Sequence, residues 1–496
     1  MSHDTEKARA EQFEGSIKKP IATNWDLEEE DWTPEEEKAL VRALDIRIVP
    51  LVTLLYLLCF IDRSNIGNAR IQGMQDDVGL EGLKFNWALT IFYIFYLIVE
   101  IPSNILLKHI GPKFYIPFLI FAFGIISLCT AFVQSFAGLC IARAFLGIAE
   151  GGTMPGIAFL LSCFYKRHEL LFRIGIFVSA SSLAGAFGGL LATGLSKIPT
   201  WGVNSDPIHS WRNIFFFEGL ITVCVAIMGY FLMPSSPAAC KFLTPRQTHI
   251  ATLRIAHDHK ESAPEATSLY HIKRALLNIN NFFCAFGFFF INVTVQSFSL
   301  FLPTILRALG WTSTRAQLLT VPPYAVACCF SIFIAWLSDK HRRRGIYLCF
   351  CSLLTIIGYA VLVTVDSPNI KYMAVFFAAS GAFPLGPGFL SWSLNNAAGP
   401  SVRAVTGGYV VSVGTAGAIL ATWTYIPSDG PNYIKGHSIN LGAQAIAATI
   451  SICAVLYIRW ENSLRNRGGR DYRLQGLTEE EARGLGYRHP EFRYIE

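Results

Sequence analysis

The chain has 496 residues, of which 52% are hydrophobic and only 15% are charged. About a quarter of the residues in a soluble globular domain are charged, so this composition excludes an ordinary soluble protein. The formal net charge of +6 sits largely in segments between and beyond apolar stretches. We interpret it as membrane topology rather than as affinity for nucleic acid.

The first 44 residues are predicted to form a polar tail. The chain opens with MSHDTEKARAEQFEGS, which is acidic and polar and has no apolar core, so we expect no cleaved signal peptide. We expect the segment up to Glu37 to be solvated and without fixed structure, because it has little apolar surface to bury.

Twelve apolar stretches follow the tail. A helix needs ~20 apolar residues to cross the hydrocarbon core of a bilayer, and each stretch is long enough to do so. The predicted spans are residues 48–69, 87–107, 114–133, 138–163, 174–195, 213–233, 282–302, 318–337, 346–365, 373–394, 404–426 and 439–460.

A long polar break between Ser235 and Asn278 divides six spans from six and holds six basic residues. The predicted fold is an all-α integral membrane protein with twelve transmembrane helices in two pseudo-symmetric six-helix bundles. We expect an N-terminal tail (1–44), a first bundle (45–233), a central loop (234–277), a second bundle (278–460) and a C-terminal tail (461–496).

Similar sequence features recur in the two halves of the chain, separated by roughly 230 residues. The second and eighth spans both end in a very short loop with a glycine and basic residues, at 107–113 and 336–345. The fifth and eleventh spans carry small residues at 185–189 and 414–418, which let helix backbones approach closely in lipid. Two such halves with a site at their midplane interface are the layout of rocking transporters.

Lys and Arg are about twice as frequent in the loops that share a side with the N-terminus as in the opposite loops. By the positive-inside rule we expect both termini in the cytosol, and we expect the membrane to be the plasma membrane.

Several charged residues lie inside the apolar stretches, and the sequence singles out Asp62 and Arg63 near the end of the first and Arg143 and Glu150 in the fourth. A charge at membrane depth costs at least ~2.5–3.5 kcal/mol, so it normally faces a cavity, pairs with another charge or serves transport. The first and fourth spans run in opposite directions, which places Asp62 and Arg143 at similar depth as candidates for an ion pair. Glu150 lies two helical turns deeper than Arg143 on nearly the same face.

The motifs around these charges resemble a known family. The twelve-span plan is similar to the major facilitator superfamily, and the string 60–69 (FIDRSNIGNA) resembles the first-helix signature of its anion:cation symporter family. Within that family the chain resembles the fungal branch of allantoate, nicotinate and pantothenate permeases. Four further segments carry the resemblance: 100–104, 143–152, 211–219 and 395–400.

The buried charges and the resemblance together predict a secondary active transporter that couples protons to a small organic anion. Arg63 and Arg143 would attract a carboxylate, since a guanidinium group can hold it through two hydrogen bonds. Asp62 and Glu150 would carry the coupling protons. The alternatives are a charge network that only holds helices together, an efflux carrier on the same fold, and a transporter-like nutrient sensor.

Further polar residues complete the predicted site. Tyr93, Tyr96, Asn292, Gln296, Asn395 and Asn396 are candidates for substrate binding, and helix packing is the alternative for each. Glu100, Asp339, Arg342 and Arg343 are predicted to form a structural network at the gate on the termini side. We interpret Glu218 as a structural partner of Arg212 or of a neighbour.

No feature of the sequence indicates catalysis. The eleven histidines lie in loops, in tails and at helix ends, most cysteines lie inside apolar stretches, and no phosphate-binding loop is present. We therefore predict that the protein is not an enzyme and has no cofactor and no metal. The predicted partners are an organic anion, protons and the lipid bilayer, with no nucleic acid, and we expect a monomer.

Overall fold

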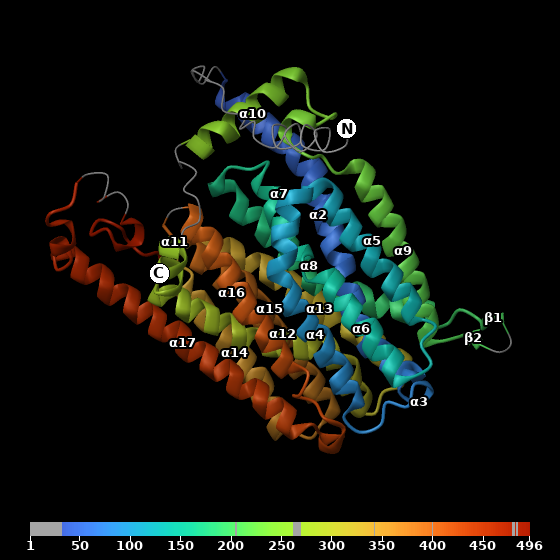
Figure 1. The fold of residues 1–496 in the computed structure, drawn as a ribbon. Coiled ribbons are helices and arrows are strands. Elements are labelled where there is room, and N and C mark those ends of the chain that lie inside the picture. Colours follow the sequence, from blue (N-terminus) through green and yellow to red (C-terminus); the bar gives the residue numbers. More distant parts are fainter. Residues whose placement is uncertain are drawn as a thin grey trace, which may run out of the picture.

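A computed structural model describes residues 32–203, 206–260, 269–341, 343–398, 400–478, 482 and 485–496. The described chain is almost entirely helical, apart from an antiparallel pair of short strands, β1 (Trp201–Val203) and β2 (Asp206–Ile208) (Figure 1). Short helical segments connect the long helices: η1 (Arg70–Met74), α3 (Gln75–Asp77), η2 (Pro237–Ala239), η3 (Pro427–Asp429), η4 (Asp471–Leu474) and η5 (Gly486–Arg488).

The first group of helices precedes the central segment. Its members are α2 (Pro34–Ala69), α4 (Lys84–Ile110), α5 (Pro112–Thr130), α6 (Phe136–Glu150), α7 (Thr153–Ser162), α8 (Arg167–Leu195) and α9 (Trp211–Leu232). Two details differ from the predicted elements. The fourth span is broken between α6 and α7 at Gly151 and Gly152, where glycine weakens the helix. The first helix begins at Pro34, inside the segment expected to lack structure, because Thr33 and Glu36 form a capping box.

The second group follows two amphipathic helices of the central segment, α10 (Pro245–Lys260) and α11 (Leu269–Leu276). Its members are α12 (Ile279–Ala308), α13 (Ser313–His341), α14 (Gly345–Thr364), α15 (Pro368–Asn395), α16 (Pro400–Ala421) and α17 (Ile434–Asn466). Among the described residues, 11 helical segments are long and apolar enough to cross a membrane, and α16 adds a shorter apolar stretch over Val405–Ala421. The predicted twelve-helix membrane fold is confirmed.

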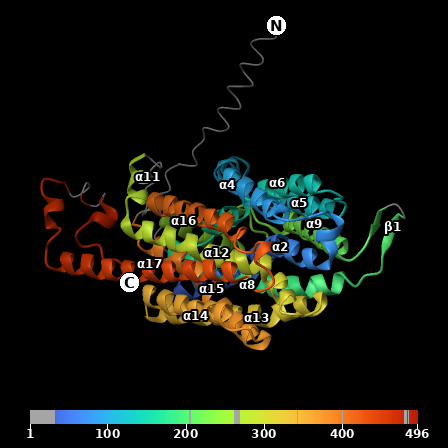
Figure 2. The ribbon, with the colours of Figure 1, turned by 90° about the horizontal axis from the view of Figure 1, so that it is seen from below.

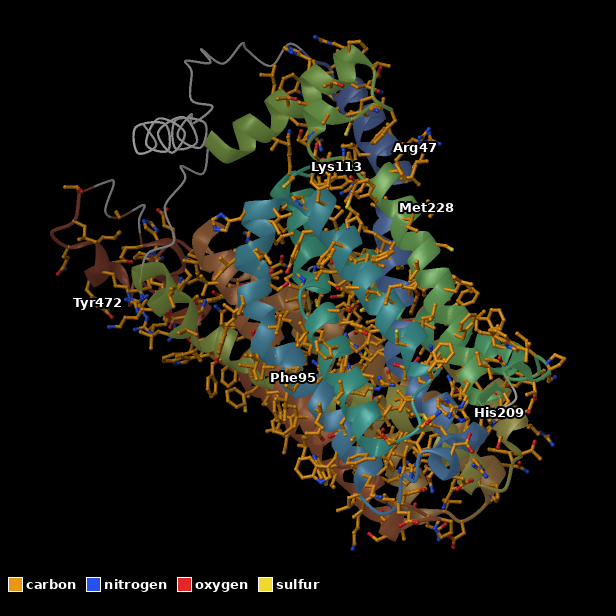
Figure 3. All side chains as sticks on the ribbon, turned by 45° about the vertical axis from the view of Figure 1, so that its right-hand side comes forward. Arg47, Phe95, Lys113, His209, Met228 and Tyr472 are labelled. Atoms are coloured by element: carbon orange, nitrogen blue, oxygen red, sulfur yellow. The ribbon has the colours of Figure 1, made fainter. Side chains whose placement is uncertain are left out.

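The sides of the bundle are covered by apolar side chains, as a lipid-facing surface requires. Phe95 and Met228 are exposed on the flanks, whereas Arg47 and Lys113 lie toward one end and His209 lies toward the other (Figure 3). We call the end that carries α10, α11 and the described chain termini the termini side, and the opposite end, with the β1–β2 hairpin, the far side (Figure 1).

Each group of helices packs mainly on itself. In the first group α4 packs on α6, α5 on α9 and α2 on α8; in the second, α14 packs on α15 and α12 on α16. Figure 2 shows α5, α6 and α9 on one side of the molecule and α14, α16 and α17 on the other. One buried apolar cluster lies mostly in the first group and another mostly in the second. The observed packing is that of two six-helix bundles.

The two bundles meet along α8 and α13, with α2 against α12 and α4 against α16. Small residues allow this approach. A Cβ atom added to Gly185 would lie 2.7 Å from the ring of Tyr324, and one added to Gly189 would lie 2.9 Å from the carbonyl oxygen of Gln317. Gly185 and Gly189 of the fifth span therefore face the other bundle, whereas Gly188 lies near Ser64 of its own bundle. Their counterpart Gly417 instead meets the backbone of Phe289 within its own bundle.

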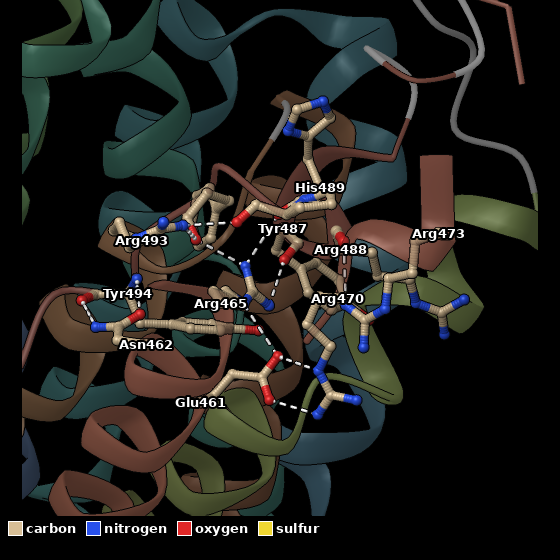
Figure 4. A network of polar contacts seen from close by, with 12 residues as sticks. Glu461, Asn462, Arg465, Arg470, Arg473, Tyr487, Arg488, His489, Arg493 and Tyr494 are labelled. Carbon is tan, nitrogen blue, oxygen red and sulfur yellow. Dashed lines mark hydrogen bonds and ion pairs between the residues drawn. The ribbon is translucent and has the colours of Figure 1, made fainter. Parts of the chain in front are cut away.

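The C-terminal segment folds back onto the termini side of the second bundle (Figure 4). Arg465 organises it: its guanidinium donates to Glu461 at 3.0 Å and to the carbonyl oxygens of Tyr487, His489 and Phe492. The side chain of Arg465 is buried, so these bonds replace water around the ion. The predicted domain limits at 44, 233, 277 and 460 remain predictions.

Candidate functional site

A cavity lies between the two bundles and encloses about 710 Å³, part of it open to solvent. Its wall is mostly aromatic and aliphatic, with a few polar groups that converge from both bundles, as in typical small-molecule sites. The aromatic lining comes from Tyr56, Phe60, Tyr93, Tyr96, Phe288 and Phe383. The polar lining comes from Arg63, Ser181, Asn292, Gln296 and Thr415.

An ion pair forms the charged part of this wall. The Nη2 and Nε atoms of Arg63 donate to one carboxylate oxygen of Glu150, at 2.8 and 3.2 Å. The Cys59 thiol donates to the same oxygen at 3.3 Å. Glu150 has no exposed surface, whereas Arg63 lines the cavity. A carboxylate taken out of water in this way is stabilised chiefly by its partner.

Aromatic rings surround the Arg63 guanidinium. Its central carbon lies 5.0 Å from the ring centres of Phe60 and Tyr96 and 5.4 Å from that of Phe92. The negative face of each ring attracts the cation, so these contacts hold the group in place without neutralising it. Arg63 is therefore held as an ion at the cavity wall, paired with Glu150.

Gly147 of α6 and Gly151, which directly follows α6, bring α4 close to this pair. A Cβ atom on Gly147 would lie 3.1 Å from the backbone nitrogen of Tyr96, and one on Gly151 would lie 2.7 Å from its carbonyl oxygen. Because both positions lack a side chain, the α4 backbone packs closely against this segment. Tyr93 and Tyr96 of α4 then line the cavity.

Tyr93 also joins the two bundles. Its hydroxyl donates to the side-chain oxygen of Gln296 at 2.8 Å, from α4 to α12. Asn292 lies one helical turn from Gln296 and lines the same cavity. The structure thus brings Arg63, Tyr93, Tyr96, Asn292 and Gln296 together on one cavity wall, while their roles toward a substrate remain predictions.

Asp62 and Arg143 lie elsewhere, and the ion pair expected between them does not form. Consecutive helix residues point about 100° apart. Since Arg63 faces the cavity, Asp62 faces the interior of its own bundle, where the hydroxyl of Ser127 donates to it. Arg143 is buried and lies 5.9 Å from the ring centre of Phe215. The expected pairing is therefore wrong; the pair that forms is Arg63 with Glu150.

Asn395 and Asn396 lie at the termini-side end of α15, outside the cavity lining. Asn396 accepts from the backbone nitrogen of Ile495 at 2.8 Å and donates to its carbonyl oxygen at 3.1 Å. α15 continues without interruption past Pro384 and Pro387, which carries the two asparagines out of the midplane. In this structure Asn396 therefore secures the C-terminal segment.

The predicted gate residues form no common network. Glu100 is buried on α4 and takes a hydrogen bond from Ser412 of α16. Asp339 pairs with Arg344 in the α13–α14 connection, and Arg343 bonds with Ser338 there. The contacts of Asp339 and Arg343 remain within the second bundle, whereas Glu100 faces α16 from the first, and Arg342 lies outside the described residues.

Of the two partners predicted for Glu218, Arg212 or a neighbour, it is not Arg212 that bonds with it. The side chain of Arg212 donates to the carbonyl oxygen of Ala131 at 2.6 Å, and Glu218 accepts from Asn65 of α2. The sequence reasoning also missed Tyr56, Cys59 and Phe60. They lie seven, four and three residues before Arg63, which places them on the same face of the helix as Arg63. This spacing was the signal that the sequence offered.

Hydrogen bonds between the bundles concentrate on the far side. Asn86 donates to the carbonyl oxygen of Thr422 at 2.6 Å, and Gln72 donates to Gln317 at 2.9 Å. Arg307 and Ser313 both donate to the carbonyl oxygen of Ile71, at 3.1 and 2.7 Å. These hydrogen bonds connect η1, α4, α12, α13 and the end of α16 across the far side. They hold the two bundles together at that side.

Comparison with known proteins settles the family. The sequence model of the Major Facilitator Superfamily matches residues 52–422. The chain belongs to this superfamily. The "MFS-type transporter efuF" of Hormonema carpetanum is 32% identical over 440 residues, 88% of each chain. The "MFS-type transporter cnsO" of Penicillium expansum is 33% identical over 476 residues, 92% of this chain and 90% of the relative.

Solved structures agree on the fold. A bacterial homologue of the human lysosomal transporter Spinster, crystallised inward-facing and unoccupied, covers 85% of this chain and 97% of its own, with a TM-score of 0.61 and 19% identity. The match to the D-xylose-proton symporter covers 82% of this chain and 97% of the symporter, with a TM-score of 0.62 and 14% identity. This major facilitator protein is therefore a multi-pass membrane transporter.

Replacing Asn86 by Ala is expected to loosen the far side of this transporter. The change removes donors to the carbonyl oxygens of Thr422 and Tyr425, and each net hydrogen bond is worth about 0.5–1.5 kcal/mol. With two bonds lost, hydrogen–deuterium exchange of the far-side end of α16 should become roughly fivefold to 100-fold faster. Thr364→Ala, which loses only a bond within its own helix, is the control. Equal exchange in both variants would contradict this assignment of the closed side.

Proposed function

We propose that this transporter moves a small organic anion together with protons by alternating access, and that it acts as a monomer. Arg63 binds the anion and Glu150 carries the coupling proton. The observation that supports this proposal is the ion pair itself: a buried carboxylate and an arginine at the cavity wall, bonded at 2.8 Å.

The pair makes proton and anion binding depend on each other. While Glu150 is ionised, it occupies the Arg63 guanidinium, and breaking a buried pair costs about 3–5 kcal/mol. A proton on Glu150 removes the negative charge and leaves Arg63 free for a carboxylate from the cavity. Each ligand thereby strengthens the binding of the other, and this reciprocal coupling is what a symporter requires.

The rest of the cavity suits an anion with one charge and a compact, partly apolar body. Arg63 is the charged side chain of the described lining, and aromatic rings make up much of the remaining wall. Asn292 and Gln296 can donate to or accept from polar groups of the substrate. A second carboxylate on the substrate would meet no second cation there, and its desolvation would go uncompensated.

The orientation follows from the charge of the loops. We propose that the termini side is cytosolic, because Lys and Arg concentrate on that side. We also propose that the membrane is the plasma membrane, in line with the permeases that the chain resembles. The structure then corresponds to the state closed toward the exterior. The resemblance of FIDRSNIGNA (60–69) to the anion:cation symporter signature supports the same substrate class.

The proposal is tested by uptake of labelled acids into cells that express the full chain. The panel contains allantoate, nicotinate, pantothenate, biotin, a sugar acid and a dipeptide. We expect at least one acid to accumulate faster at acidic external pH and to lose this accumulation when a protonophore is added. Accumulation that is the same with and without the protonophore would contradict proton coupling. Deletion that raises the retained amount of a cellular acid would indicate export instead.

A further inference from the structure

Two arginines from different bundles lie close together on the far side. Arg70 directly follows α2 in the first bundle, and Arg307 lies in the last turn of α12 in the second. Helix α12 packs on η1, the segment that begins with Arg70. The guanidinium of Arg307 donates to the carbonyl oxygen of Ile71 at 3.1 Å, which brings this second cation beside the backbone of the first. We call Arg70 and Arg307 the far-side arginine pair.

Arg70 is held in place but not neutralised. Its side chain is almost fully withdrawn from solvent, with 7% of the residue exposed. The Nε atom donates to the side-chain oxygen of Gln75 at 3.0 Å, and the central carbon of the guanidinium lies 4.3 Å from the ring centre of Phe85. Neither contact carries a negative charge. Within the described ranges, the two terminal nitrogens of Arg70 have no hydrogen-bond acceptor, so their donors are available to a ligand.

The acids of neighbouring segments do not compensate the pair. Asp77 accepts from an indole nitrogen of α9 at 2.6 Å, and Asp429 accepts from two backbone nitrogens at the start of α17. Among the residues that the structure describes, the ionisable groups that act electrostatically on Arg70 are Arg307 and Tyr433. Two cations that are close together and partly out of water repel each other, and an anion between them removes this cost.

We propose that the far-side arginine pair is a second anion-binding site, which holds one small anion, a halide or a carboxylate group, between Arg70 and Arg307. The terminal nitrogens of both guanidinium groups supply charge-assisted hydrogen bonds, and the hydroxyl of Tyr433 can add a neutral one. Each bundle contributes one of the two cations. An anion held here therefore joins the bundles and stabilises the arrangement in which their far-side ends are in contact.

This inference goes beyond the proposed function and does not require it. Arg70 lies seven residues after Arg63, about 10 Å further toward the far side, and is outside the cavity lining. A halide bound at the pair would bias the far-side contact without being transported. A carboxylate bound there would be that of an organic anion outside the cavity, and only its identity with the transported substrate rests on the proposed function.

Hydrogen–deuterium exchange of the full-length protein in lipid nanodiscs tests the site. Choline chloride or choline acetate replaces choline methanesulfonate at constant ionic strength. At an anion concentration ten times its Kd, exchange in η1 and at the start of α17 should become about tenfold slower, because bound anion depletes the opened state. We expect Arg70→Gln and Arg307→Gln each to remove this effect. Lys197→Gln removes an exposed cation elsewhere on the far side and should retain it.

The variants separate this site from the cavity. If Arg70→Gln does not fold, the exposed Arg307 still permits the test: Arg307→Lys keeps the charge and should require more anion for the same slowing, whereas Arg307→Gln should show none. Slowing by chloride alone would assign a halide, and slowing by acetate alone a carboxylate. No slowing in the wild type, or equal slowing in wild type and Arg307→Gln, would overturn the proposal. Slowing that is lost in Arg63→Gln but kept in Arg70→Gln would also overturn it, while supporting the anion site in the cavity.

Discussion

Replacing Arg63 by Gln is expected to abolish anion transport and to destabilise the protein. The change removes the cation of the cavity wall and leaves Glu150, which has no exposed surface, without its partner. Losing one member of a buried pair costs about 3–5 kcal/mol, because the remaining charge stays out of water. Losing two charge-assisted hydrogen bonds to a carboxylate should weaken binding by at least about 100-fold. Uptake kinetics and thermal unfolding in detergent measure the two effects.

The double variant Arg63→Gln with Glu150→Gln separates stability from function. Two neutral amides replace the pair, so most of the lost thermal stability should return, while transport should remain absent. Arg63→Lys keeps the charge but loses the planar fork, and we expect weakened transport rather than none. Normal affinity in Arg63→Gln would assign the pair to helix packing and would remove the anion site from this cavity.

Replacing Glu150 by Gln is expected to uncouple transport from the proton gradient. The amide has nearly the same shape as the carboxyl group but cannot take up or release a proton. Arg63 would then be free for the anion at any pH, so exchange of labelled for unlabelled substrate should persist. Accumulation above the equilibrium level should fall to none, because the proton gradient can no longer bias the binding step. Vesicles preloaded with substrate, with and without an imposed pH gradient, measure both activities.

Asp45→Asn is the matched control for that experiment. It also removes a carboxylate of α2 from an ion pair, here with Arg173 at 2.6 Å, but lies toward the termini side and outside the cavity lining. We expect accumulation by Asp45→Asn to remain sensitive to a protonophore. If Glu150→Gln accumulates substrate as well as this control does, then Glu150 is not the coupling group.

Two features of the site could be read from the sequence because they depend on local pattern. Charged residues inside apolar stretches carry a high cost in lipid, so Asp62, Arg63, Arg143 and Glu150 stood out without a structure. Positions four apart share a helix face, which is why Asn292 and Gln296 could be expected on the same surface. The structure places both on the cavity wall.

The misassigned partners have one common cause. Depth along a helix follows from counting residues, whereas the rotation of the helix about its axis depends on what packs against it. Asp62 and Arg143 have similar depth, but α2 is turned so that Arg63 faces the cavity and Asp62 faces α5. Likewise, the partner of Asn396 is Ile495, which lies 99 residues further along the chain, and no local pattern identifies it.

The amino-acid sequence alone determined that this protein crosses a membrane in twelve helices, because the length and hydrophobicity of each stretch are local properties set by the thickness of the bilayer. It also determined which ionisable groups are costly enough to need an explanation. Only the tertiary structure decided that Glu150 pairs with Arg63, that Glu218 accepts a hydrogen bond from Asn65, and that hydrogen bonds between the bundles gather on the far side. These are contacts between distant segments, and they depend on how α2, α6 and α9 rotate and pack, which hydropathy does not encode.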